Sequence, residues 1–179
     1  MGRHSFISVL VILCVGMLIA CAGLSYAGNS VSGSLTLNKV KIKLLHAYID
    51  EVNPDSPIVA LSDKPLQGDF SIGILSDKFI KKNKVHVLIF EISPKEKKLA
   101  TGGLGALYFP GKKIHYVAIA DKLALTLDKI DNSKIEGKIS TSKPIVDDFY
   151  EITLSCEASF KVNRGKSNAK AEPLKKKSQ

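Results

Sequence analysis

Apolar and polar residues alternate along most of this chain with the period of two that is typical of β-strands. In the clearest run, residues 150–162, polar side chains alternate with an apolar row formed by Ile152, Leu154, Cys156, Ala158 and Phe160. Further strands are expected at residues 35–37, 85–92, 114–120, 123–127 and 135–139. Because alternation turns one face toward the core, Cys156 is expected to be a buried and unreactive thiol.

Short turn motifs separate these runs. Phe109-Pro110-Gly111-Lys112 has proline second and glycine third, a type II pattern that should join strand 104–109 to strand 113–120. Asp131-Asn132-Ser133 and Asn53-Pro54-Asp55 predict two more turns. Regularly spaced short strands predict an all-β fold, an antiparallel β-sandwich of about seven to nine strands over residues 32–162, with an immunoglobulin-like arrangement as one form. Residues 76–82 predict its one short helix, capped by Ser76.

The first 27 residues have the pattern of an export signal and are excluded from the fold. A basic start at Arg3 precedes an uncharged apolar run from Phe6 to Ala20, and Ser25-Tyr26-Ala27 provides a cleavage site. Leu18-Ile19-Ala20-Cys21 also fits a bacterial lipobox, in which residues 1–20 are removed and Cys21 is lipidated. Cleavage after Ala27 would release the domain, whereas lipidation would anchor it to a membrane. Both alternatives predict an exported protein, either periplasmic or extracellular, or a membrane-anchored lipoprotein.

Positive charge is concentrated near the end of the chain. The formal net charge is +9, of which residues 28–163 carry only +3. Residues 163–179 are predicted to form a disordered basic tail, since they contain almost no apolar side chains to bury. A run of this kind is typical of a solvated tail that aids solubility. The functional alternative is a tether to an anionic envelope surface, with Lys175, Lys176 and Lys177 as its densest part. Nucleic acid is not expected as a partner of an exported protein.

Several short segments resemble a family of uncharacterised bacterial exported proteins with a β-sandwich domain. These segments are His46-Ala47-Tyr48, residues 58–66, residues 135–139, Tyr150-Glu151-Ile152 and Phe160. The resemblance covers most of residues 32–162. It implies the fold and the compartment, and it implies no activity.

Histidine is the residue type most worth testing for chemistry. His46, His86 and His115 lack the spacing of metal ligands, and His86 and His115 are expected to face outward or lie at strand edges. His46 shares strand parity with Ile42 and Leu44, which predicts that it points inward and bonds to the backbone. A functional role for His46 is the alternative.

Other candidate motifs favour structural roles. The acidic pairs Asp50-Glu51 and Asp147-Asp148 lack a calcium-loop pattern and indicate solvated loop charge. Gly102-Gly103-Leu104-Gly105 does not have the spacing of a phosphate-binding loop and predicts a hairpin connection or bulge.

No cofactor is implied by these motifs. The sequence favours a non-catalytic binding or structural module of the cell envelope, whose partner is an envelope protein or a small ligand. The alternative is an envelope enzyme with a site built from loops, which a cleft gathering His46, Asp50 and Asp63 would favour.

Overall fold

A computed structural model describes residues 29–66, 80, 82–110, 115–149 and 151–165 of this chain. These residues form twelve strands and one 3-10 turn, Ala120–Lys122. The strands are β1 (Ser30–Leu37), β2 (Val40–Leu44), β3 (His46–Asp50), β4 (Ile58–Ser62), β5 (Val87–Ser93), β6 (Lys98–Leu99), β7 (Gly105–Phe109), β8 (His115–Ala118), β9 (Leu123–Ile130), β10 (Lys134–Thr141), β11 (Ile145–Asp147) and β12 (Ile152–Asn163).

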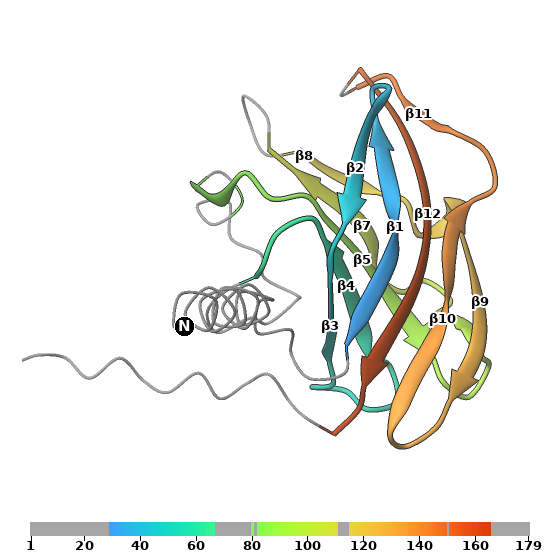
Figure 1. Ribbon diagram of the computed structural model, residues 1–179. Helices are drawn as coiled ribbons and strands as arrows, with labels where there is room; N and C mark the ends of the chain where they lie inside the picture. Colours follow the sequence, from blue (N-terminus) through green and yellow to red (C-terminus); the bar gives the residue numbers. More distant parts are fainter. Residues whose placement is uncertain (1–28, 67–79, 81, 111–114, 150, 166–179) are drawn as a thin grey trace, which may run out of the picture.

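The strands make two antiparallel sheets that face each other (Figure 1). The first sheet has the order β2-β1-β12-β10-β9, with β11 paired to β12. The second sheet has the order β3-β4-β5-β7-β8, with β6 paired to β5. The predicted all-β sandwich is therefore confirmed, with more strands than expected. The second sheet is a meander of neighbouring strands, and the immunoglobulin-like form is not confirmed.

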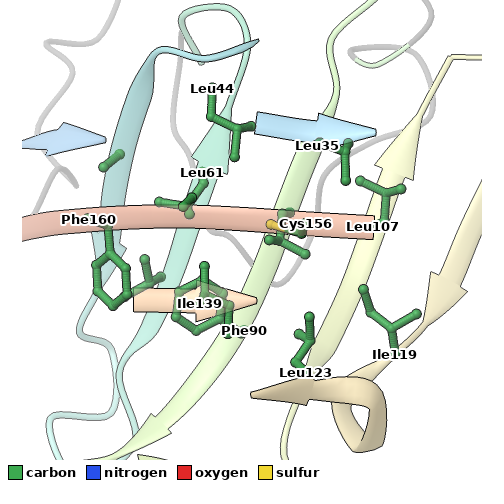
Figure 2. Close-up of a cluster of buried hydrophobic side chains, with 14 of the residues drawn as sticks. Leu35, Leu44, Leu61, Phe90, Leu107, Ile119, Leu123, Ile139, Cys156 and Phe160 are labelled. Carbon is green, nitrogen blue, oxygen red and sulfur yellow. The ribbon is translucent and has the colours of Figure 1, made fainter. Parts of the chain in front are cut away.

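One hydrophobic core fills the space between the sheets. Figure 2 shows core residues that both sheets contribute. They include Leu35, Cys156 and Phe160 from the first sheet and Leu61, Phe90 and Leu107 from the second. Phe90 and Phe160 meet edge to face, with ring centroids 5.3 Å apart. Such a pair stabilises by about 0.5–1.5 kcal/mol beyond the area that it buries. Strand β12 alternates buried and solvent-facing positions along its length, as its sequence predicts.

A second, smaller hydrophobic cluster lies on the other face of the second sheet. Tyr48, Ala60 and Ile89 contribute from the strands, and Leu66, Ile80 and Val85 cover them from the β4–β5 connection. The Tyr48 hydroxyl accepts a hydrogen bond from the Leu66 backbone N–H at 2.9 Å. The second sheet is thus covered on both faces, whereas the outer face of the first sheet is polar. Of the predicted helix at 76–82, Ile80 and Lys82 are helical, and the other five residues lie outside the described residues.

The predicted turns join neighbouring strands. Asp131 organises the β9–β10 turn by accepting hydrogen bonds from the backbone N–H groups of Ser133 and Lys134 at 2.7 and 2.9 Å. The Ser133 hydroxyl also donates to this carboxylate at 2.6 Å, and this bond, together with the backbone bonds, holds the pKa of Asp131 well below its usual range. β7 pairs with β8 across the predicted Pro110 turn, whose residues 111–114 lie outside the described residues. The glycine loop at 102–105 leads into β7, where a side chain on Gly105 would collide with the backbone of Ala120.

The domain extends further at both ends than 32–162. β1 begins at Ser30, and β12 continues to Asn163, whose backbone N–H donates to the Asn29 side chain at 2.8 Å. Arg164 and Gly165 also bond to the domain. The boundary of the basic tail was therefore placed too early, because composition alone did not reveal that Arg164 has an acidic partner.

Candidate functional site

His46 does not point into the core between the sheets. The chain crosses from the first sheet to the second at Leu45, so the parity of His46 with Ile42 and Leu44 is broken. His46 is half-buried and pairs in register with Ser62, on the face that also carries Tyr48. The ring centroids of His46 and Tyr48 are 6.5 Å apart. Burial lowers the pKa of His46, although the nearby Asp63 carboxylate acts in the opposite direction.

Asp63 has a different histidine as its partner. One Asp63 oxygen lies 2.8 Å from Nδ1 of His86, and the other accepts the His86 backbone N–H at 2.8 Å. Burial raises the pKa of Asp63, but the hydrogen bonds from His86 outweigh it and hold the pKa below its usual value. His86 immediately precedes β5 and faces this carboxylate, so of the two expected placements it lies at the end of a strand and does not point freely outward. The pair extends the β4–β5 ladder by one residue.

This arrangement does not assemble a nucleophile. Ser62 is fully buried, and its hydroxyl donates to the backbone carbonyl of Lys64 at 2.7 Å. A hydroxyl in that position is engaged and out of reach of a substrate. Asp50 lies at the far end of β3, about 13 Å from His46 at the rise of an extended strand. The cleft that would have favoured an enzyme is therefore not formed by His46, Asp50 and Asp63.

Cys156 is also unsuited to chemistry. Its side chain is 5 % exposed and packs in the core between the sheets, as predicted. Burial, with a smaller contribution from Glu157, raises the pKa of the thiol to about 12. Among the described residues, no group of three or more histidine, cysteine, aspartate or glutamate side chains could hold a metal ion.

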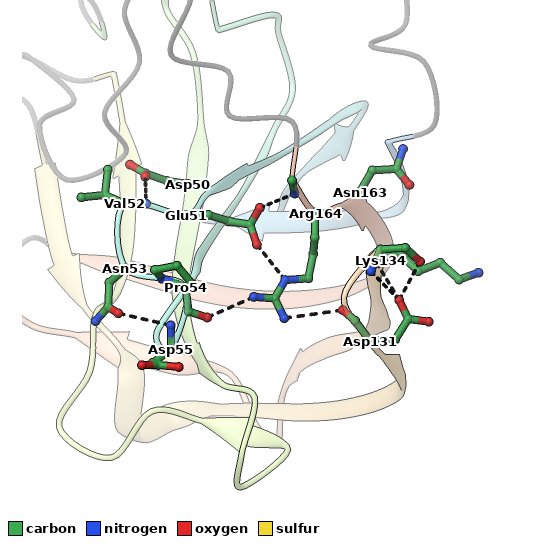
Figure 3. A network of polar contacts seen from close by, with 12 residues as sticks. Asp50, Glu51, Val52, Asn53, Pro54, Asp55, Asp131, Lys134, Asn163 and Arg164 are labelled. Atoms are coloured by element: carbon green, nitrogen blue, oxygen red, sulfur yellow. Dashed lines mark hydrogen bonds and ion pairs between the residues drawn. The ribbon is translucent and has the colours of Figure 1, made fainter.

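Glu51 is not a solvated loop charge but the centre of a polar network (Figure 3). One of its oxygens lies 2.7 Å from Nε of Arg164, and the other accepts the Gly165 backbone N–H at 2.7 Å. Nη2 of Arg164 also donates to the carbonyl of Pro54 at 3.0 Å. The two side chains are only 13 % and 14 % exposed. The network fastens the end of β12 to the β3–β4 turn and thereby joins the two sheets.

The best candidate for a binding site is a groove on the outer face of the first sheet. It has a volume of about 540 Å³, within the size range of ligand pockets. Strands β1, β2, β10 and β12 form its floor, and the connection from β10 to β11 forms one wall. Its lining is polar and includes Ser34, Thr36, Ser140, Thr141, Ser142 and Ser155, with Lys41, Lys143 and Glu157.

The register of the strands explains how these side chains come together. Thr36 lies opposite both Lys41 and Ser155, and Glu157 lies opposite both Ser34 and Ser140. β10 leaves β12 after Ser140, and Thr141 then accepts the Cys156 backbone N–H through its hydroxyl at 3.2 Å. This departure lets residues 142–144 rise beside the sheet. The groove is therefore a consequence of where β10 ends its pairing.

The groove offers both hydrogen-bonding groups and charge. Ser34, Thr36, Ser140 and Ser155 are half-buried, and their hydroxyls make no hydrogen bond to another described residue. Lys41, Lys143 and Glu157 are exposed at its rim. Half-buried hydroxyls that are not used by the fold are available to a ligand or to ordered water. Two ammonium groups and one carboxylate leave the rim with a net positive charge.

Several predicted site residues lie outside the described residues. These are Cys21 and the three lysines Lys175, Lys176 and Lys177. Within the described residues, no helix is long and apolar enough to cross a membrane.

Comparison with known proteins adds no relative. No protein-family model matches the chain, and no curated protein or solved structure matches it. The resemblance to exported β-sandwich proteins therefore stays a prediction.

Proposed function

We propose that this chain is an exported, non-catalytic binding module of the bacterial envelope, and that the groove on its first sheet binds an acidic sugar unit. The observation that carries this proposal is the set of half-buried hydroxyls beside Lys41 and Lys143. An acidic sugar presents carboxylate or phosphate oxygens together with many hydroxyls. The ammonium groups suit the anion, and the serine, threonine and glutamate side chains suit the sugar hydroxyls.

The leader supports export, and the basic tail supports an anionic surface nearby. Envelope glycans and phosphate-bearing polymers have this chemistry. The half-open shape of a groove on a sheet face fits one unit of a longer polymer, which could enter and leave along the strands. The engaged Ser62 hydroxyl and the buried Cys156 thiol argue for binding rather than for turnover.

The test is titration calorimetry with oligogalacturonate as the acidic probe and maltoheptaose as the neutral probe. We expect oligogalacturonate to bind and maltoheptaose to bind more weakly. The double substitution Lys41→Ala/Lys143→Ala should weaken oligogalacturonate binding about tenfold, since each exposed charge pair contributes up to about 1 kcal/mol.

Two further variants separate the groove from general charge. Lys122→Ala/Lys138→Ala removes the same charge from exposed positions that do not line the groove, and it should bind nearly as the parent does. Thr36→Val/Ser155→Ala keeps every charge but removes two groove hydroxyls, and it should also lose affinity. Equal losses in the two lysine double variants, or no loss in the hydroxyl variant, would refute the groove as the site.

A further inference from the structure

Glu157 is an unpaired acid in a groove whose other charges are positive. It lines the groove from β12 together with Lys41 and Lys143, and its carboxylate makes no ion pair or hydrogen bond with another described residue. On the same outer face of the first sheet, the carboxylate of Glu136 is neutralised by Nζ of Lys134 at 2.6 Å. The fold therefore pairs one glutamate of this face and leaves the carboxylate in the groove available to a ligand.

The two lysines of the groove lie on opposite sides of β12. Lys41 on β2 is in register with Thr36 on β1, and Thr36 is in register with Ser155 on β12. Lys143 follows β10 on the other side of β12, in the connection that forms one wall of the groove. Because neighbouring strands are about 4.8 Å apart, both ammonium groups can reach an anion that lies above the hydroxyls of Thr36 and Ser155.

Glu157 lies farther along the same face of β12. It is two residues from Ser155, a distance of about 7 Å along the strand. At about this distance in water, two unit charges change an affinity roughly threefold. An anion held between the lysines is therefore repelled by Glu157, and a ligand that carries a positive charge at that distance from its anion turns the repulsion into attraction.

We propose that the ligand of this groove is a phosphorylated amino sugar, with its phosphate between Lys41 and Lys143 and its protonated amine at Glu157. The inference rests on the proposed function, because it specifies the acidic sugar unit that the same groove binds. Two ammonium groups and two hydroxyls suit the several oxygens of a phosphate. A sugar ring between phosphate and amine separates the two charges and brings hydroxyls to Ser34 and Ser140, which lie opposite Glu157 on either side.

Four small probes titrated into the full chain test this ligand class, with affinities measured by NMR at about pH 6.5, where the amine is protonated. Glucosamine 6-phosphate has both charges on a sugar ring, and glucose 6-phosphate lacks the amine. N-acetylglucosamine 6-phosphate keeps the bulk of the nitrogen substituent without its charge, and phosphoethanolamine has both charges without a ring. We expect glucosamine 6-phosphate to bind about three- to fivefold more tightly than the other three, since its amine adds one exposed charge pair and its ring meets the hydroxyls.

Glu157→Gln tests the role of the carboxylate. It should abolish the preference for glucosamine 6-phosphate over glucose 6-phosphate, and it should strengthen the binding of glucose 6-phosphate and of oligogalacturonate about threefold, because the repulsion is removed. Asp128→Asn is the matched control, since Asp128 is an exposed acid on β9 of the same sheet that does not line the groove. It should keep the preference for the amine.

The two proposals about the groove fail in different ways. If neither the sugar phosphates nor oligogalacturonate bind, or if Lys41→Ala/Lys143→Ala binds them as the parent does, the groove is not an anion site and both proposals are wrong. If these anions bind in the groove but the amine gives no advantage, or Glu157→Gln retains that advantage, only the amino-sugar inference is overturned. Phosphoethanolamine that binds as tightly as glucosamine 6-phosphate would also overturn it, because the sugar ring would then not be recognised.

Discussion

Replacing Arg164 by alanine should destabilise the domain by about 2–3 kcal/mol, although the sequence places this residue at the edge of a basic tail. The change removes the guanidinium that meets Glu51 at 2.7 Å and Pro54 at 3.0 Å. Glu51 is then left half-buried with the Gly165 N–H as its remaining partner in the network. The network also fastens the two sheets at one end, so its loss affects the whole sandwich.

The magnitude follows from the exposure of the pair. Exposed ion pairs contribute about 0–1 kcal/mol, whereas breaking a fully buried pair costs about 3–5 kcal/mol. Side chains that are 13 % and 14 % exposed lie between these limits, closer to the buried one. Arg164→Lys keeps the charge but loses the planar fork that reaches two acceptors at once, so it should lose about 1–2 kcal/mol.

Urea denaturation followed by circular dichroism measures the effect, with an unchanged m value as the sign that the unfolded state is the same. Lys161→Ala is the control, since that ammonium is 43 % exposed and lies 3.6 Å from Glu136. It should change the free energy of unfolding by less than about 0.5 kcal/mol. A double-mutant cycle with Glu51→Gln should show coupling between the two positions. If Arg164→Ala behaves like Lys161→Ala, or if the two changes at 51 and 164 are additive, the network does not stabilise the fold.

Four further outcomes are expected. Cys156 should react with a thiol reagent only as fast as the protein unfolds, because the side chain is buried and its pKa is raised to about 12; rapid labelling of the native protein would contradict this. Asp63→Asn should lower the free energy of unfolding above pH 3.8 but change it little in stronger acid. The reason is that the pKa of Asp63 in the folded protein lies below 3.8, so the stability that its carboxylate contributes is lost as pH falls through that folded pKa. Equal losses of stability at pH 6 and pH 2 in urea titrations would refute this direction of the pH dependence. Mass spectrometry of the mature protein should find either a lipidated Cys21 or a free Gly28 at the N-terminus, and an intact leader would refute export. Deletion of residues 166–179, which include Lys175, Lys176 and Lys177, should reduce sedimentation with anionic vesicles at low salt, and equal binding with and without the segment would refute the tether.

The strands were predictable because their signal is local. In β12 the alternation of apolar and polar residues continues for the whole strand, and the structure buries the apolar row, including Cys156. The same holds for β10, whose Ile135 and Ile139 are fully buried. A strand needs only its own sequence to show which face it will bury, provided that the strand is not interrupted.

The errors lie where the chain changes direction or sheet. His46 appeared to continue the row of Ile42 and Leu44, but Leu45 carries the chain into the second sheet and the count of alternate faces restarts. Alternation predicts a face only within one strand, and a single connecting residue is enough to remove the relation. A half-exposed histidine with a lowered pKa results, instead of a core histidine.

Contacts between distant segments could not be predicted from pattern. Glu51 and Arg164 are 113 residues apart, and each looked like ordinary loop or tail charge until the sandwich brought them together. The groove has the same origin, since its hydroxyls come from three strands and a connection. Serine and threonine on the solvent face of a strand are common, and only the end of the β10–β12 pairing turns these into a concave site.

The topology also determines how an anchored form of this protein would present its groove. β1 starts and β12 ends at the same end of the sandwich, where Ser30 pairs with Lys161 and Arg164 meets Glu51. The groove residues Thr36, Lys41 and Ser155 lie toward the opposite end, beside the β1–β2 turn. A lipid at Cys21 would therefore hold the domain by the end that is farther from the groove. If the anchored form exists, the groove faces away from the membrane that holds the protein, and a ligand carried by that same membrane would reach it only through a long polymer. Binding of envelope material by the anchored protein should then depend on chain length of the glycan, whereas the released domain should bind short and long glycans with similar affinity per site.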